Sequence, residues 1–149
     1  MDTRKINREE LNQIEALEQV IFSDSWSLES LTASFLKDNA LFLCCVHNEE
    51  IVGYVIAYFA AEEGEIIRIA VKPGERRKGI GGHLLLGIED FCEQYGIEKL
   101  FLEVRESNEA AIAFYEEYGF KNVGLRKDYY SVPNEDAIVM SRELETDRR

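Results

Sequence analysis

Residues 69–82 read Ile-Ala-Val-Lys-Pro-Gly-Glu-Arg-Arg-Lys-Gly-Ile-Gly-Gly, and this segment is the most informative about the fold. It begins as a β-rich run, turns at Pro73-Gly74, and passes through a basic cluster into a segment with helical spacing. That cluster is the densest positive charge in a chain whose net charge is −12 at pH 7. A helix start has unpaired N–H groups and a positive dipole end, and glycines let an anion approach the backbone. The stretch therefore predicts an anion-binding turn between a strand and a helix.

Two common phosphate-binding motifs do not fit this turn. A Walker loop that began at Gly74 would need a lysine directly after Gly79, where Ile80 stands. A dinucleotide-binding fingerprint that began at Gly79 would need Gly or Ala where Leu84 stands. The alternative to an anion site is a solvated helix start, because charged runs are usually solvated.

The segments around this turn predict one mixed domain over residues 1–149. Apolar spacing of the helical kind indicates helices over 8–22, after Ser27, over 79–96 and over 108–118. Runs rich in β-branched and aromatic residues predict strands over 3–6, 41–47, 51–59, 65–72, 99–105, 120–126 and 137–144. This order favours an α/β (α+β) domain, with a mixed central sheet of about six or seven strands flanked by about four helices.

The composition excludes several classes of protein. With 17 basic and 29 acidic residues, the chain should repel nucleic acid and attract a basic substrate. No apolar run approaches the ~20 residues of a membrane helix, and no secretory signal is visible. The three cysteines form no disulfide framework, and alternation puts Cys44 and Cys45 on opposite faces of a strand as buried thiols. The two histidines form no metal-ligand motif, so we expect a cytoplasmic domain without a metal.

A carboxylate and a tyrosine in the second half are candidates for acid–base chemistry. Residues 100–105 alternate, so Glu103 shares a strand face with Phe101 and Arg105. A partly buried carboxylate can serve as a general base, and an ion pair with Arg105 is the alternative. A tyrosine such as Tyr115, with a reference pKa of ~10, can protonate a thiolate of pKa ~8.5, and a place in the aromatic core is the alternative. Asn108 is the expected N-cap of the helix that carries Tyr115.

The basic turn resembles the signature of a known family. Residues 76–81 resemble the Gln/Arg-x-x-Gly-x-Gly/Ala pattern of the GNAT superfamily of N-acetyltransferases. The resemblance implies acetyl-CoA as cosubstrate, with its pyrophosphate on main-chain N–H groups of the turn and its pantetheine along the preceding strand. The cofactor-binding residues that it implies are Ile69, Ala70, Val71, Arg77, Lys78, Gly79, Ile80, Gly81, Gly82 and Asn108.

Further segments resemble the RimI branch of that superfamily, the ribosomal-protein alanine N-acetyltransferases. They are Phe22-x-x-x-Trp26-Ser27, residues 102–120, residues 126–130 and residues 135–140. The resemblance implies that Glu103 is the general base and Tyr115 the general acid, and that Tyr129 and Tyr130 help to hold the acceptor. Trp26 either packs in the core or lines the acceptor groove. Ser25 and Arg68 depart from the family pattern, because proline is common at the first position and a smaller or uncharged residue at the second.

The expected function is direct acetyl transfer from acetyl-CoA to the N-terminal α-amine, of the alanine type, of a basic protein such as a ribosomal protein. An α-amine of pKa ~8 is ~10% neutral at pH 7, whereas a lysine of pKa ~10.4 is far below ~1% neutral. One alternative is an acetyltransferase for a small polyamine or amino sugar. The other is an acyl-CoA-binding module that has lost catalysis. We expect a monomer or weak dimer that binds neither membrane nor nucleic acid directly.

Overall fold

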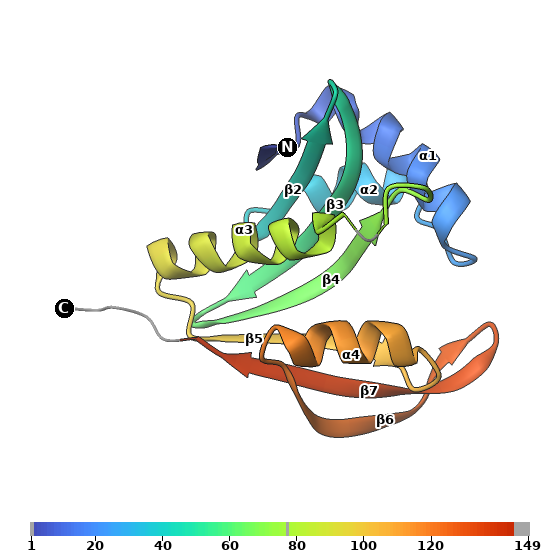
Figure 1. The fold of residues 1–149 in the computed structure, drawn as a ribbon, viewed down its shortest axis with the longest axis vertical. Coiled ribbons are helices and arrows are strands. Elements are labelled where there is room, and N and C mark those ends of the chain that lie inside the picture. The colour runs from blue at the N-terminus through green and yellow to red at the C-terminus, as the bar shows by residue number, and fades with distance from the viewer. Residues whose placement is uncertain (1, 77, 145–149) are drawn as a thin grey trace.

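Seven strands form one sheet in the order β1-β2-β3-β4-β5-β7-β6 (Figure 1). The computed structural model describes residues 2–76 and 78–144 of the chain. The strands are β1 (Asp2–Lys5), β2 (Ala40–His47), β3 (Glu50–Ala60), β4 (Glu63–Val71), β5 (Lys99–Arg105), β6 (Lys121–Ser131) and β7 (Asn134–Glu143). The helices are η1 (Arg8–Glu10), a 3₁₀ turn, and α1 (Leu11–Ile21), α2 (Leu28–Phe35), α3 (Ile80–Tyr95) and α4 (Glu109–Glu117). The predicted mixed sheet and its helices are confirmed.

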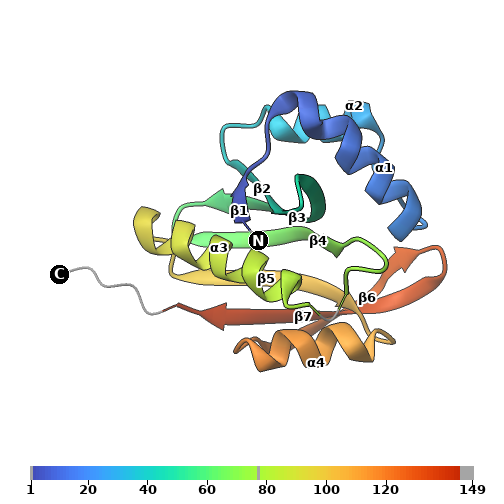
Figure 2. The same ribbon diagram turned by 45° about the horizontal axis from the view of Figure 1, so that its top comes forward.

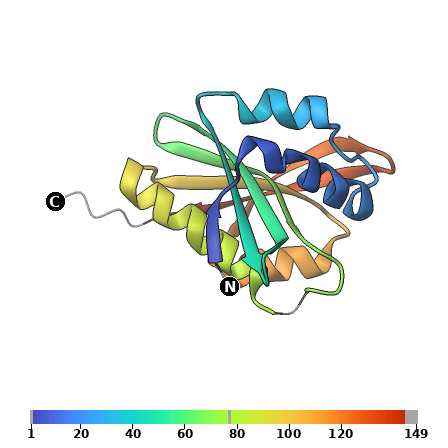
Figure 3. The same ribbon diagram turned by 90° about the horizontal axis from the view of Figure 1, so that it is seen from above.

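Helices cover both faces of the sheet (Figures 2 and 3). On one face, α1 and α2 pack on β2 and β3 through an apolar cluster that includes Leu11, Leu31 and Phe42. On the other face, α3 and α4 pack on β2, β3 and β5 through a second cluster. The alternation of a strand separates Cys44 and Cys45 into these two cores, as predicted, and both thiols are buried and free.

The sheet splits between its two central strands. β4 and β5 run parallel and pair from Glu63↔Lys99 only as far as Ile66↔Leu102. Beyond that point β4 stays with β3 and β5 stays with β7, and the two halves diverge (Figure 1). The register between β3 and β4 shifts at the same place, because Ile56 faces Arg68 whereas Ala57 faces Ile66. This bulge turns the second half of β4 away from β5.

Candidate active site

The second half of β4 presents an open backbone edge to the split. Its residues Ile69, Ala70 and Val71 pair with β3 on one side, through Val55, Tyr54 and Gly53. On the other side, pairing with β5 has already ended at Ile66↔Leu102. An unpaired strand edge offers N–H and C=O groups to an extended ligand. The strand that the family resemblance assigns to the pantetheine thus has one open edge.

The turn after β4 leads into an uncapped helix start. Gly79 is the N-cap of α3 with φ of +79°, a left-handed conformation that favours glycine, and no side chain in the described part of the chain caps this end. Lys78 forms an ion pair with Glu75, with 3.0 Å between Nζ and Oε2. The N–H groups at such a helix start are available to an anion. Arg77, which the family resemblance assigns to the same site, lies outside the described residues.

The next glycines have a packing role that the sequence did not indicate. A Cβ atom on Gly82 would collide with the hydroxyl of Tyr118, and one on Gly81 would lie 3.0 Å from the ring of Phe114. Phe114 lies in α4 and Tyr118 directly follows it, so these glycines let α3 and α4 approach each other closely. Ile80, between Gly79 and Gly81, is buried in the core.

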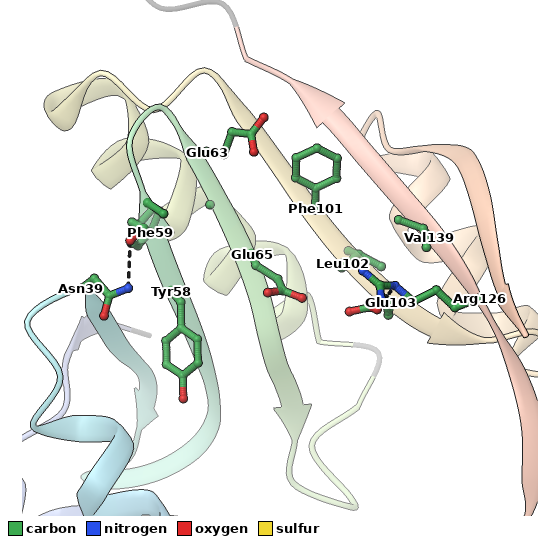
Figure 4. A pocket seen from close by; sticks show the side chains of 12 residues that line it. Asn39, Tyr58, Phe59, Glu63, Glu65, Phe101, Leu102, Glu103, Arg126 and Val139 are labelled. Atoms are coloured by element: carbon green, nitrogen blue, oxygen red, sulfur yellow. Dashed lines mark hydrogen bonds and ion pairs between the residues drawn. The ribbon is translucent and has the colours of Figure 1, made fainter. Parts of the chain in front are cut away.

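Glu103 lies one residue beyond the last pair between β4 and β5, on the sheet face opposite α3 and α4 (Figure 4). Its side chain is 11% exposed and forms an ion pair with Arg126 of β6, with 2.6 Å between Oε2 and Nε. The alternative that pairs Glu103 with Arg105 is wrong. Arg105 instead contacts Glu135, with 3.2 Å between Nη1 and Oε1, and lies over the ring of Tyr130.

A pocket of about 400 Å³ opens beside Glu103 on the same face. It lies over the paired ends of β4 and β5, and Figure 4 shows the carboxylates of Glu65 and Glu103 pointing into it. Partial burial raises the pKa of Glu65, and so do the hydrogen bond with Glu103 and its negative charge, while Arg126 opposes them. Glu65 was not predicted from the sequence, although its register beside Phe101 places it on the face of Glu103.

Tyr115 lies on the other side of the sheet from Glu103. Its side chain is buried against the rings of Phe114 and Phe120, with ring centroids 5.3 and 5.7 Å away, in the core beneath α3 and α4. Burial and the neighbouring phenol of Tyr130 raise the pKa of Tyr115 above its ordinary value. The phenol is therefore protonated at neutral pH.

The other site residues predicted from the sequence, Asn108, Tyr129, Tyr130 and Trp26, lie in three different parts of the fold. Asn108 is the N-cap of α4, as expected, since its Oδ1 accepts a hydrogen bond from the backbone N–H of Ala111 at 3.2 Å. Tyr129 and Tyr130 lie in β6 with ring centroids 5.0 Å apart. Tyr129 lies near Glu103, and burial followed by the charges of Glu103 and Glu65 raises the pKa of Tyr129. Trp26 is partly buried and packs against the core beneath α1 and α2.

The sequence matches a family model over most of its length. Residues 9–120 match the model of the acetyltransferase (GNAT) family. The chain belongs to this family. It is therefore an N-acetyltransferase that uses acetyl-CoA as cosubstrate, and the open edge of β4 and the uncapped start of α3 fit that substrate.

Several proteins are similar over more than four-fifths of the chain. Ribosomal protein bS18-alanine N-acetyltransferase of Escherichia coli K12 is 36% identical over 127 residues, which cover 84% of this chain and 85% of that protein. The protein of the same name from Haemophilus influenzae is 35% identical over 143 residues, covering 88% and 96%. The crystal structure of the Escherichia coli ribosomal-protein-S18-alanine N-acetyltransferase superimposes with a TM-score of 0.90 at 31% identity, covering 98% and 95%.

No helix among the described residues is long and apolar enough to span a membrane. No group of three or more His, Cys, Asp or Glu side chains in residues 2–76 and 78–144 is arranged to hold a metal ion.

The proximity of the Glu65 and Glu103 carboxyl groups should make the free energy of unfolding depend on pH. A carboxyl whose pKa is raised by folding contributes stability below its unfolded pKa, and that contribution is lost as the pH rises through the folded value. At pH 7, which is above the unfolded pKa, the Glu65 carboxyl therefore opposes folding. We expect Glu65→Gln to raise the free energy of unfolding at pH 7 by about 0.5 kcal/mol, and the gain to shrink below about pH 4. Urea denaturation at both pH values, with exposed Glu63→Gln as control, measures this difference; a loss of stability at pH 7 contradicts it.

Proposed function

We propose that this enzyme acetylates the N-terminal α-amine of a protein that begins with alanine, and that the acceptor is a ribosomal protein. The observation that carries this proposal is the position of Glu103 at the mouth of the β4–β5 split, beside Tyr129 and open to the pocket. The names of the relatives at 36% and 35% identity support the choice of acceptor.

Acetyl-CoA would bind in the split from the side of α3. In the proposed arrangement the pantetheine follows Ile69–Val71 of β4, and the main-chain N–H groups of residues 78–82 hold the pyrophosphate. Main-chain N–H groups of the same strand would polarise the thioester carbonyl. Asn108 would contact the cosubstrate from the start of α4, and Arg77 is assigned to this site by the family resemblance alone.

The acceptor would approach from the opposite face, where the pocket lies. Its ammonium gives a proton to Glu103, directly or through a water, and the resulting amine attacks the thioester carbon. The C–N bond forms, the C–S bond breaks, and Tyr115 gives its proton to the departing thiolate. The nitrogen then loses its second proton to solvent, from which the phenolate of Tyr115 regains a proton. Glu103 and Tyr115 lie on opposite sides of the sheet, which supports these two roles. The base then contacts the acceptor, and the acid contacts the coenzyme.

The electrostatics favour a basic acceptor. The chain has a net charge of −12, which attracts a basic peptide over long range. Near the base, Tyr129 and Tyr130 provide an aromatic wall in β6 against which a peptide can lie. We assign Tyr129, Tyr130 and Trp26 to the acceptor side of the site.

A substrate comparison tests the proposed acceptor against a small amine. Purified enzyme and acetyl-CoA are incubated with a basic peptide that begins with alanine, with spermidine and with glucosamine, and released CoA is measured as thiol. We expect kcat/KM for the peptide to exceed that for either small amine by at least about 100-fold. A preference for spermidine or glucosamine would overturn the peptide assignment. Binding of CoA without turnover of any amine would indicate a silent module.

A further inference from the structure

The proposed reaction does not use a fully buried carboxylate in α1. Glu18 is 0% exposed, and donors from three other segments converge on it. The backbone N–H of Trp26 donates to its Oε1 at 2.9 Å, and the hydroxyl of Tyr54 in β3 donates to its Oε2. Arg68 of β4 donates through Nη2 at 2.9 Å and through Nε at 3.1 Å. A buried carboxylate with a bidentate guanidinium partner has a strongly defined geometry.

Arg68 makes further contacts, all with the segment that connects α1 to α2. Its Nη2 donates to the backbone oxygen of Asp24 at 2.9 Å and lies 3.5 Å from the carboxylate of the same residue. Its guanidinium carbon lies 3.9 Å from the ring centroid of Phe22 and 5.7 Å from that of Trp26. One side chain of β4 thus contacts the connection at three positions, residues 22, 24 and 26.

This connection borders the acceptor side of the site. In all three ribbon views the end of α1 and the loop after it lie beside the tip of the β6–β7 hairpin (Figures 1–3). Burial, the neighbouring Tyr129 and the charge of Glu103 raise the pKa of Tyr130 to about 12, and the negative charge of Asp24 adds to this rise. Arg68 also directly precedes Ile69, so it links the connection to the strand assigned to the pantetheine.

We propose that Glu18 and Arg68 are positioning residues that hold residues 22–26 against β4 as one wall of the acceptor groove, and thereby set the affinity for the acceptor. The effect on acceptor affinity rests on the proposed function, whereas the role of the pair in holding residues 22–26 against β4 does not. The pair acts through Trp26 and its neighbours and does not contact the reacting atoms. Its loss should therefore weaken acceptor binding more than acetyl-CoA binding.

The first measurement uses Trp26, the one tryptophan in the chain, as a reporter of the connection. Acrylamide quenching of its fluorescence is compared in the wild type, Arg68→Met and the charge-balanced double variant Glu18→Gln/Arg68→Met. We expect the quenching constant to rise at least about twofold in both variants as Trp26 becomes more accessible. If Arg68→Met does not fold, the double variant alone is used, because the double variant leaves no buried charge unpaired. Wild-type quenching in a folded variant would overturn the proposal.

The control is a second bidentate pair on the same side of the fold. Arg4 donates to Glu10 at 2.8 and 2.7 Å near the start of the chain, away from the split. Arg4→Met removes one arginine of an ion pair, as Arg68→Met does, and should leave the quenching of Trp26 as in the wild type. A rise equal to that in Arg68→Met would overturn the local role of Arg68.

The second measurement separates the two substrates. In the charge-balanced double variant we expect KM for the alanine peptide to rise about tenfold and KM for acetyl-CoA to change less than about twofold. Arg68→Lys keeps the positive charge but loses the bidentate contact with Glu18 and the stacking on Phe22. Its KM for the peptide should therefore lie between those of the double variant and the wild type. Equal rises in both KM values, or no rise in the peptide KM, would overturn the role in acceptor affinity. Wild-type enzyme that fails to acetylate any peptide contradicts the proposed function instead, and the quenching result still decides the role of the pair.

Discussion

In Glu103→Gln, kcat/KM for an alanine peptide at pH 7 falls by about 10²- to 10⁴-fold, the usual contribution of a general base. The substitution keeps the size of the side chain but removes the carboxylate that receives the proton of the acceptor ammonium. The loss should narrow above about pH 8, because the α-amine then loses its proton to solvent without help. Steady-state release of CoA between pH 6 and pH 9 measures both effects.

The matched control is Glu63→Gln, which makes the same change of charge in the same pocket, at its far end. Glu63 pairs with Lys99 at the closed end of the split, so its loss should lower kcat/KM by much less than the loss of Glu103. Wild-type turnover at pH 7 in Glu103→Gln contradicts the assignment of the base. An equal loss in both variants would indicate that the pocket acts only through its total charge.

In Tyr115→Phe, kcat falls about 100-fold while the Kd for CoA changes less than about threefold. The ring stays in its aromatic cluster, so packing is kept and only the proton donor is lost. Initial rates at saturating concentrations of both substrates give kcat, and calorimetric titration with CoA gives Kd. Tyr95→Phe removes a hydroxyl from an exposed tyrosine at the end of α3 and should not change either value. A wild-type kcat in Tyr115→Phe shows that the thiolate leaves without this acid.

The local parts of the site could be predicted from the sequence. The strand, turn and helix start of residues 69–82 follow from β-rich residues, a Pro-Gly turn and helical spacing that occur consecutively in the chain. Alternation in residues 100–105 likewise put Glu103 on the face opposite Leu102 and Val104, which lie in the core with Tyr115.

The split and the partners of the buried charges could not be predicted in this way. The split depends on where the register between β3 and β4 shifts, and pairing between strands leaves no local signal. Arg126, and not Arg105, is the partner of Glu103, because the side chain of Arg126 reaches across β7 from the outermost strand β6. The pair of Glu18 and Arg68 joins residues 50 positions apart, so only the folded chain brings them together.

The β6 strand is longer than its sequence pattern indicated. The prediction ended it at residue 126, whereas it continues to Ser131. Asp128 adopts a positive φ of 54°, and its backbone N–H donates to Asp136 at 2.8 Å, which bridges an irregularity in the pairing with β7. Tyr129 and Tyr130, which follow the end of the predicted strand, therefore lie within β6 beside Glu103.

The most direct measurement is mass spectrometry of a basic peptide that begins with alanine after incubation with the enzyme and acetyl-CoA. A copy whose α-amine is already acetylated, but whose lysines are free, is treated in parallel. We predict that the free peptide gains one acetyl group, placed on its first residue by fragmentation, and that the blocked copy gains none. Acetylation of the blocked copy on lysine, or no transfer to the free peptide while acetyl-CoA still binds, would contradict N-terminal acetylation as the function of this enzyme.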